Sequence, residues 1–188
     1  MAYLLAGLVV FLGVHSVRVF GEGWRTGAIA RMGELPWKGV YSLVSIAGFV
    51  LLVWGYGQAR QQMPLWDPPT WTKHVTALLM LPVFPMFVAS YVPRNAIRAR
   101  LKHPQVLSVK LWALAHLVSN GNLADVLLFG AFLAWAIVDF RAARRRTANA
   151  QPMETRGAMT ALTVVVGLVL YVVFAMWLHG VLIGVRPF

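Results

Sequence analysis

The sequence has little charge for its length. Only 12% of its 188 residues are Asp, Glu, Lys or Arg, whereas 59% are hydrophobic and the mean hydropathy is +0.67. Soluble domains average about 25% charged residues, because polar side chains have to cover their surface. The shortage of charge excludes an ordinary water-soluble globule and predicts a protein of the lipid bilayer.

Cysteine is absent from the chain. Its absence excludes disulfides, thiolate metal sites, cysteine nucleophiles and the covalent C-x-x-C-H attachment of haem. Any haem that this chain binds is therefore non-covalent. The sequence also has no P-loop and no G-x-G-x-x-G, G-x-S-x-G or H-E-x-x-H motif, which excludes the soluble catalytic sites that these motifs mark.

Long apolar stretches nearly free of charge predict five membrane-spanning helices, because each has the roughly 17–25 residues that cross the hydrocarbon core. The five stretches are Met1–Phe20, Gly39–Gly57, His74–Val92, Asn122–Phe140 and Ala158–Gly180. A sixth stretch, Pro104–Ser119, is apolar from Leu111 to Val118 but is short for a crossing. The first stretch lacks the basic start and the cleavage pattern of a signal peptide, so we expect it to be retained.

The distribution of Lys and Arg decides how the short stretch is counted. Two basic runs, 94–110 and 141–156, flank the segment Pro104–Phe140. A single crossing of that segment would place the runs on opposite sides, against the preference of Lys and Arg for the cytoplasm. A tight turn at Asn120-Gly121-Asn122, where Asn-Gly supplies positive φ, would place both runs on one side. We therefore predict an all-α bundle of six membrane helices, with the short helix just before the Asn-Gly-Asn turn.

In this topology 14 of the 17 Lys and Arg residues lie on the cytoplasmic side, and both termini lie on the outer side. A net charge of +11 is also typical of nucleic-acid binding. Basic loops beside anionic headgroups explain the same charge, however. We expect the lipid bilayer, and no nucleic acid, as the partner of this charge.

Prolines and acidic residues give weaker signals. Pro82 and Pro85 lie inside the third predicted span, where they either kink the helix and open space beside it or are simply tolerated. Asp125 and Asp139 lie near the ends of the span 122–140, where we expect water or headgroups to solvate them. No pair of carboxylates shares a helix face at mid-membrane, which argues against a proton-pumping relay.

Two of the five histidines are placed inside the membrane. His15 is five residues from the cytoplasmic end of its span at Phe20, and His116 is 12 residues beyond Pro104, where the short helix enters. At about 1.5 Å per residue both lie in the cytoplasmic half or the middle of the hydrocarbon core. His74, His103 and His179 lie near the surfaces.

An ionisable side chain at this depth needs a partner, so it marks a candidate functional site. One explanation is that each histidine bonds a carbonyl or hydroxyl of a neighbouring helix, which is the better explanation for one histidine alone. Two at compatible depth on different helices favour a shared metal. An imidazole pair without a deep carboxylate or thiolate suits haem iron better than calcium, magnesium or zinc.

Five motifs carry a resemblance to a known family. They are Gly13-Val14-His15-Ser16-Val17-Arg18, Gly39-Val40-Tyr41-Ser42 with the apolar run to Trp54-Gly55-Tyr56, Lys102-His103-Pro104-Gln105, Leu111-Trp112-Ala113-Leu114-Ala115-His116-Leu117 and Asn120-Gly121-Asn122. With these motifs the chain resembles, over nearly its whole length, the NnrU family of small bacterial membrane proteins, which are relatives of zeta-carotene isomerase. We accordingly expect one integral membrane domain over residues 1–188, in the bacterial inner membrane.

The resemblance implies a haem b bound inside the bilayer, whose ligands by the motifs fall on His15 and His116. In the isomerase, reduced haem serves to isomerise a double bond of a long polyene. Bacterial NnrU-like proteins are associated with nitric oxide and nitrite metabolism. The resemblance therefore supports the cofactor more strongly than the reaction.

Haem propionates need cations, and the candidates on the side nearest the proposed iron are Arg18, Arg94, Arg98 and Arg100. Each of these also serves orientation in the membrane. His103 either donates a hydrogen bond to a propionate or caps the short helix beside Pro104. These two roles stay open at this point.

Two functions of different classes follow. In the first, one histidine leaves the reduced iron and the chain isomerises an apolar, polyene-like substrate. In the second, both ligands stay and the chain is a non-catalytic haem protein that works with a redox partner in electron transfer, gas sensing or assembly. A third interpretation, a membrane methyltransferase, rests on Lys102-His103-Pro104-Gln105 alone and ranks low, because no pair of acidic residues follows Glu154.

Overall fold

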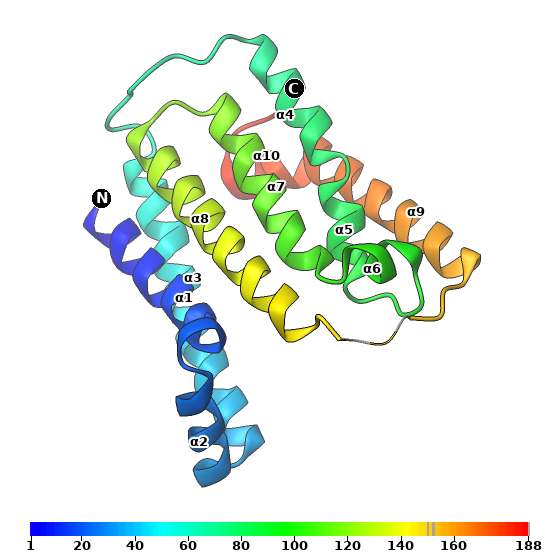
Figure 1. Cartoon of the computed structure of the whole chain (residues 1–188). Helices are drawn as coiled ribbons and strands as arrows, with labels where there is room; N and C mark the ends of the chain where they lie inside the picture. The colour runs from blue at the N-terminus through cyan, green and yellow to red at the C-terminus, as the bar shows by residue number, and fades with distance from the viewer. Residues whose placement is uncertain (150, 152, 188) are drawn as a thin grey trace. The chain divides into compact units, whose positions relative to one another are not determined.

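The computed structural model describes residues 1–149, 151 and 153–187, and within these ranges it is helical with no strand (Figure 1). The predicted all-α class is confirmed. The helices are α1 (Ala2–Phe20), α2 (Glu22–Met32), α3 (Glu34–Ala59), α4 (Trp71–Met80), α5 (Val83–Ala89), α6 (Ala96–Leu101), α7 (Pro104–Ser119), α8 (Leu123–Arg146), α9 (Gly157–Val173), the π-helical turn η1 (Phe174–Leu178) and α10 (His179–Ile183).

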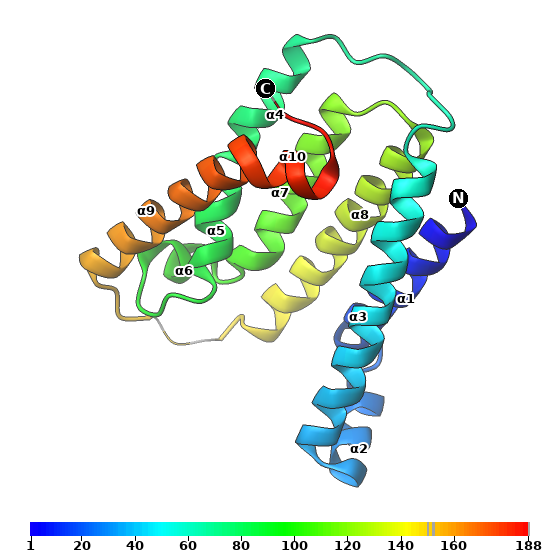
Figure 2. The ribbon, with the colours of Figure 1, turned by 180° about the vertical axis from the view of Figure 1, so that it is seen from behind.

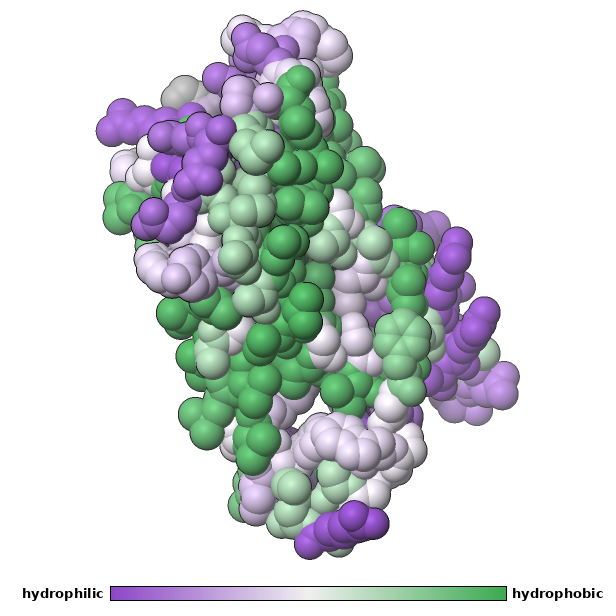
Figure 3. Space-filling view, turned by 90° about the vertical axis from the view of Figure 1, so that its left-hand side faces the viewer, coloured by the Kyte–Doolittle hydropathy of each residue, from purple (hydrophilic) through white to green (hydrophobic). Residues whose placement is uncertain are grey.

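Five helical segments are long and apolar enough to cross a membrane, and they match the five predicted spans. They are Ala2–Phe20, Glu34–Ala59, Trp71–Ala89, Leu123–Arg146 and Gly157–Ile183. Their large apolar side chains are open to the surroundings, as Val9 (73% exposed) and Leu43 (70% exposed) illustrate. In the space-filling view of Figure 3, hydrophobic side chains cover much of the face and hydrophilic residues gather towards its margins. This is the surface of a multi-pass membrane protein.

The short predicted helix is present as α7, but its crossing of the membrane stays a prediction. α7 has 16 residues, fewer than the roughly 20 that cross the hydrocarbon core. The expected left-handed turn at Asn120-Gly121 is wrong. Asn120 is extended (φ −126°, ψ 131°), and among the described glycines only Gly33 and Gly184 have positive φ.

The chain forms two compact units, which are described separately. The first unit comprises Met1–Asp67 and Gly121–Asp139, and the second comprises Pro68–Asn120 and Phe140–Phe188. Each can be followed in Figure 1 and from behind in Figure 2. The expectation of one membrane domain over residues 1–188 stays a prediction, and its last residue lies outside the described ranges.

In the first unit, α1 and α3 pack as an antiparallel pair at very short distance, because glycines lie where they meet. The closest contacts pair Leu4 with Gly55, Gly7 with Leu52 and Phe11 with Gly48. A Cβ added at Gly48 would lie 2.9 Å from the backbone nitrogen of Phe11, and one at Gly55 would overlap the backbone of Leu4. Small residues bring membrane helices together in this way, where packing replaces the hydrophobic effect.

This register also explains why α3 begins earlier than predicted. Continued along the two antiparallel helices, the pairing of Phe11 with Gly48 places Phe20, the last residue of α1, level with Gly39 of α3. Gly39 is where the sequence predicted the span to start. Glu34–Lys38 extend α3 beyond the end of α1, and α2 occupies what was expected to be a loop. Gly33, with φ +89°, joins α2 to α3.

In the second unit, the helix is interrupted at Pro82, which agrees with the first of the two alternatives that the sequence left open for its prolines. α4 ends at Met80 and α5 begins at Val83, after Pro82. At the break the amide of Leu81 donates to the carbonyl of Leu78 (3.3 Å), and the carbonyl of Ala77 accepts instead from the hydroxyl of Tyr171 (3.0 Å). A side chain of α9 thus satisfies a backbone group that the proline break leaves open.

The close glycine contact between α1 and α3 is open to a direct test. Gly55→Ala places a methyl group against the backbone of Leu4, so it should lower the stability of the protein by about 1–3 kcal/mol. Gly57→Ala is the matched control, since a Cβ there meets open space and alanine favours a helix. Thermal unfolding in detergent measures both, and equal melting temperatures for the two variants would contradict the close packing.

Candidate functional site

His15 lies in α1 of the first unit, five residues before the helix ends, and its side chain is half-buried. Its Nδ1 lies 2.6 Å from the carbonyl oxygen of Phe11, one turn back in the same helix. A carbonyl only accepts, so Nδ1 carries the proton and donates it. In a neutral imidazole this leaves the lone pair on Nε2, the atom with which such a histidine binds a metal.

Three aromatic rings surround the imidazole of His15, all within the first unit. The ring centroids of Phe11, Tyr41 and Trp135 lie 4.3, 5.5 and 6.2 Å from that of His15. The Trp135 ring stands perpendicular to the imidazole, and its buried Nε1 has no hydrogen-bond acceptor among the described residues. These rings make the surroundings of His15 apolar and restrict the access of water.

His116 lies in the last turn of α7, in the second unit. Its Nδ1 donates to the carbonyl oxygen of Trp112, 2.9 Å away and again one turn back. The carbonyl of His116 accepts in turn from the side-chain amide of Asn120 (2.8 Å). The two predicted ligands therefore have the same local arrangement, with the proton held on Nδ1.

The predicted cations are distributed between the two units. Arg18 is exposed in the last turn of α1, in the first unit. Arg94 and Arg98 lie together before and inside α6, in the second unit. The guanidinium of Arg98 donates to the carbonyl oxygen of Ser90 (3.1 Å), at the end of α5. Arg98 therefore caps a helix, a role that the sequence did not indicate.

His103 is the N-cap residue of α7, as one of the two alternatives expected, but its side chain makes no capping hydrogen bond. It occupies the residue before Pro104, but its Nε2 lies 2.8 Å from the hydroxyl oxygen of Thr147 instead. The Thr147 hydroxyl donates to the carbonyl of Ala143 (3.1 Å), so it accepts from His103. Along α7, His103 and His116 are 13 residues apart, or about 20 Å.

The remaining histidines behave as surface residues. His74 is exposed in the first turns of α4, and Nδ1 of His179 donates to the carbonyl of Val185 (2.6 Å). Within the part of the chain that the structure describes, no three His, Asp or Glu side chains gather into a metal-binding group. The predicted site has two protein ligands.

A groove of about 400 Å³ runs between α1 and α8 in the first unit. Its walls are almost wholly apolar and include Leu12, Gly13, Ala131 and Trp135. The one hydroxyl in the wall, that of Ser16, already donates to the carbonyl of Leu12 (2.6 Å). Ligand pockets usually enclose about 300–1,000 Å³. Trp135 thus forms the wall of an apolar groove on one side and contacts His15 on the other.

Comparison with known proteins places the chain in a family. A family profile described as NnrU protein matches residues 3–187. The chain belongs to the NnrU family. No curated protein and no solved structure matched it.

Membership of the NnrU family suggests a membrane protein in nitric oxide and nitrite metabolism. The match covers both units, and with them both histidines and the groove. The resemblance read from the motifs is therefore confirmed.

A buried acidic residue in this NnrU protein was missed by sequence reasoning. Asp125, expected to be solvated, is 2% exposed. Its carboxylate accepts from the Tyr56 hydroxyl (2.6 Å) and from the backbone and side-chain nitrogens of Asn122 (3.2 and 3.1 Å). The spacing Asn122-x-x-Asp125 at the start of α8 is a capping-box pattern that could have indicated this role.

The link from Tyr56 to Asp125 should stabilise the first unit. Tyr56→Phe leaves one carboxylate oxygen buried without its shortest donor, so we expect a loss of about 1–3 kcal/mol in stability. Tyr3→Phe is the control, because Tyr3 is half exposed and its hydroxyl is not part of this cluster. Unfolding curves in detergent that coincide for the two variants would argue against the link.

Proposed function

We propose that this NnrU protein is a haem b-binding integral protein of the bacterial inner membrane, with His15 and His116 as the iron ligands. The observation that carries the proposal is their shared geometry. Each imidazole donates Nδ1–H to the carbonyl four residues earlier, at 2.6 and 2.9 Å. Metal-binding histidines typically hold their second nitrogen in this way, because the bond sets the tautomer and the ring orientation.

The surroundings of His15 suit a porphyrin. Phe11, Tyr41 and Trp135 offer flat apolar surface, and Nε2 of His15 has no hydrogen-bond partner in the described part of the chain. Because the chain has no cysteine, it cannot attach haem covalently through a C-x-x-C-H motif, and haem would be held by coordination of its iron and by packing. Among the proposed propionate partners, Arg18 and Arg94 are exposed, and Arg98 donates to the carbonyl of Ser90.

When bound, haem iron would supply one-electron redox chemistry. The residues of the chain would have the other tasks. His15 and His116 would hold the metal through Nε2, and their Nδ1 hydrogen bonds fix the orientation of the rings. Phe11 and Trp135 would exclude water from the site. The low polarity that results would tune the reduction potential of the haem iron.

The proposed topology keeps six membrane helices, with α7 and α8 forming a hairpin and both termini outside. Contacts within the second unit support it, because they bring the two basic runs together. The backbone amide of Arg156 donates to the carbonyl of Arg94 (2.8 Å), and His103 bonds Thr147 (2.8 Å). These contacts support a shared side for the two runs, and the preference of Lys and Arg for the cytoplasm supports the cytoplasmic side.

A catalytic function is the second candidate, and the groove between α1 and α8 favours it. A redox-dependent isomerase of an apolar, polyene-like substrate needs an apolar channel beside the iron, and Trp135 joins this groove to His15. The alternative is a non-catalytic haem protein in electron transfer, gas sensing or assembly. It needs both imidazoles and no groove.

Removal of a ligand should remove the haem. We expect His15→Ala and His116→Ala to lose most of the Soret absorbance of the purified protein, because each variant leaves one axial position without its imidazole. His74→Ala and His179→Ala are the controls, since the sequence places both histidines near the membrane surfaces and neither is a predicted ligand, and they should keep the wild-type spectrum. The same haem content in all four variants would refute the ligand assignment.

Reduction separates the catalytic from the non-catalytic function. If the chain is an isomerase, the dithionite-reduced protein should bind carbon monoxide, with a shift of the Soret band. A reduced spectrum that stays six-coordinate and does not change with carbon monoxide would contradict catalysis at the iron and leave the non-catalytic haem protein.

A further inference from the structure

Two basic segments of the second unit, 94–102 and 141–156, lie side by side. The backbone amide of Arg156 donates to the carbonyl of Arg94 (2.8 Å), and the amide of Ala96 donates to the hydroxyl of Thr160 (2.9 Å). His103, next to the first segment, bonds Thr147 in the second (2.8 Å). One hydrogen bond thus joins the two segments directly, and two more join them through the nearby residues His103 and Thr160.

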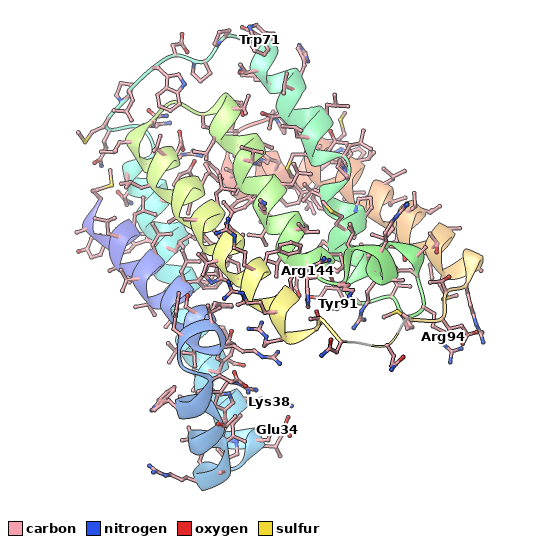
Figure 4. All side chains as sticks on the ribbon, in the orientation of Figure 1. Glu34, Lys38, Trp71, Tyr91, Arg94 and Arg144 are labelled. Atoms are coloured by element: carbon pink, nitrogen blue, oxygen red, sulfur yellow. The ribbon has the colours of Figure 1, made fainter. Side chains whose placement is uncertain are left out.

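The joined segments carry a strong positive charge. They contain nine Lys or Arg residues and a single carboxylate, that of Glu154. The cations are Arg94, Arg98, Arg100, Lys102, Arg141, Arg144, Arg145, Arg146 and Arg156. All except Arg98 are exposed. We call this set the basic surface; Figure 4 labels Arg94 and Arg144 within it.

The backbone of the basic surface is built in an unusual way. Arg94 (φ 55°) and Lys102 (φ 63°) are the two described residues other than glycine that have positive φ. They stand on either side of α6. Left-handed backbone favours glycine, so cationic side chains at both positions are held there against a local preference.

Buried hydrogen bonds hold this conformation. Asn95 is 0% exposed, and its side-chain amide donates to the carbonyls of Ala89 (2.9 Å) and Val92 (2.6 Å). Its side-chain oxygen accepts from the amide of Arg98 (2.7 Å), which caps α6. The loop therefore presents Arg94 and Lys102 from a fixed backbone, so less conformational entropy is lost when they bind an anion.

The basic surface lies where the long helices of the second unit end. α5 ends at Ala89 and α9 begins at Gly157, so the surface adjoins two helical segments that are long and apolar enough to cross a membrane, and α7 begins beside it at Pro104. Beside it, Tyr91 is 65% exposed and accepts a hydrogen bond from Gln105 (3.2 Å). Exposed tyrosine at a helix end is typical of the headgroup layer, where cations bind anionic lipids.

We propose that the basic surface binds the headgroups of anionic phospholipids, with Arg94 and Lys102 as residues that select a negative headgroup. The proposal is independent of haem. In this proposal the exposed cations of the basic surface bind the phosphate groups of lipids. A charge that only orients the protein in the membrane does not require the left-handed backbone of Arg94 and Lys102.

The double variant Arg94→Gly/Lys102→Gly tests the proposal, because glycine removes both cations and also suits the left-handed backbone. The full chain in detergent is titrated with phosphatidylglycerol and with phosphatidylcholine of the same acyl chains, and bound lipid is counted by native mass spectrometry. The wild type should prefer phosphatidylglycerol, and the preference should fall about fivefold for each cation removed. The melting temperature without lipid should stay equal or rise.

Lys73→Gln is the matched control, since Lys73 is an exposed cation on α4, outside the basic surface, and it should keep the wild-type preference. Three results would overturn the proposal. The double variant could keep its preference for phosphatidylglycerol, or inorganic phosphate could displace the lipid at equal concentration. Soluble polyglutamate could bind to the wild type in the absence of any lipid preference, which would indicate an acidic protein partner.

Discussion

The absence of water from the bilayer core is the constraint on which this structure depends. Every polar group that enters the core has to find its partner within the chain. Helices satisfy the backbone, and the polar side chains turn to backbone carbonyls one turn away. Ser16 donates to the carbonyl of Leu12, and His15 and His116 likewise bond the carbonyls four residues earlier. Tyr171 instead donates to the carbonyl of Ala77 on another helix.

For a histidine this rule has a chemical consequence. A serine that bonds a carbonyl has used its proton and has only lone pairs left, whereas an imidazole keeps a second nitrogen. Because the carbonyls of Phe11 and Trp112 hold the protons on Nδ1, the lone pairs of His15 and His116 are on Nε2. The bond that satisfies each ring also leaves Nε2 as the nitrogen through which the proposed metal would be bound.

Hydropathy alone predicted the five long helices, since a run of about 20 apolar residues has few alternatives to a crossing. For Pro82 the sequence left a kink and simple tolerance as alternatives, and the structure shows the helix interrupted there. The failures concern contacts that local sequence does not encode. Gly33 and a register set by Gly48 and Gly55 decide where α3 begins. Asp125 is buried because Tyr56, far along the chain, lies next to it.

The arginines also show which features local sequence predicts and which contacts it does not. Their number predicted a cytoplasmic side, but sequence could not distinguish a cation that caps a helix from one that faces an anion. Arg98 donates to Ser90, while Arg94 stands exposed on a left-handed backbone a few residues away. The structure separates these roles, because it shows which cations already have a backbone acceptor.

The central claim is that imidazoles from α1 and α7 bind one haem iron. Electron paramagnetic resonance of the oxidised wild-type protein, purified in mild detergent with its native haem, tests it most directly. Two axial imidazoles predict the rhombic low-spin ferric signal of bis-histidine haem. A purely high-spin signal near axial symmetry, or a protein that retains no haem iron, would contradict it.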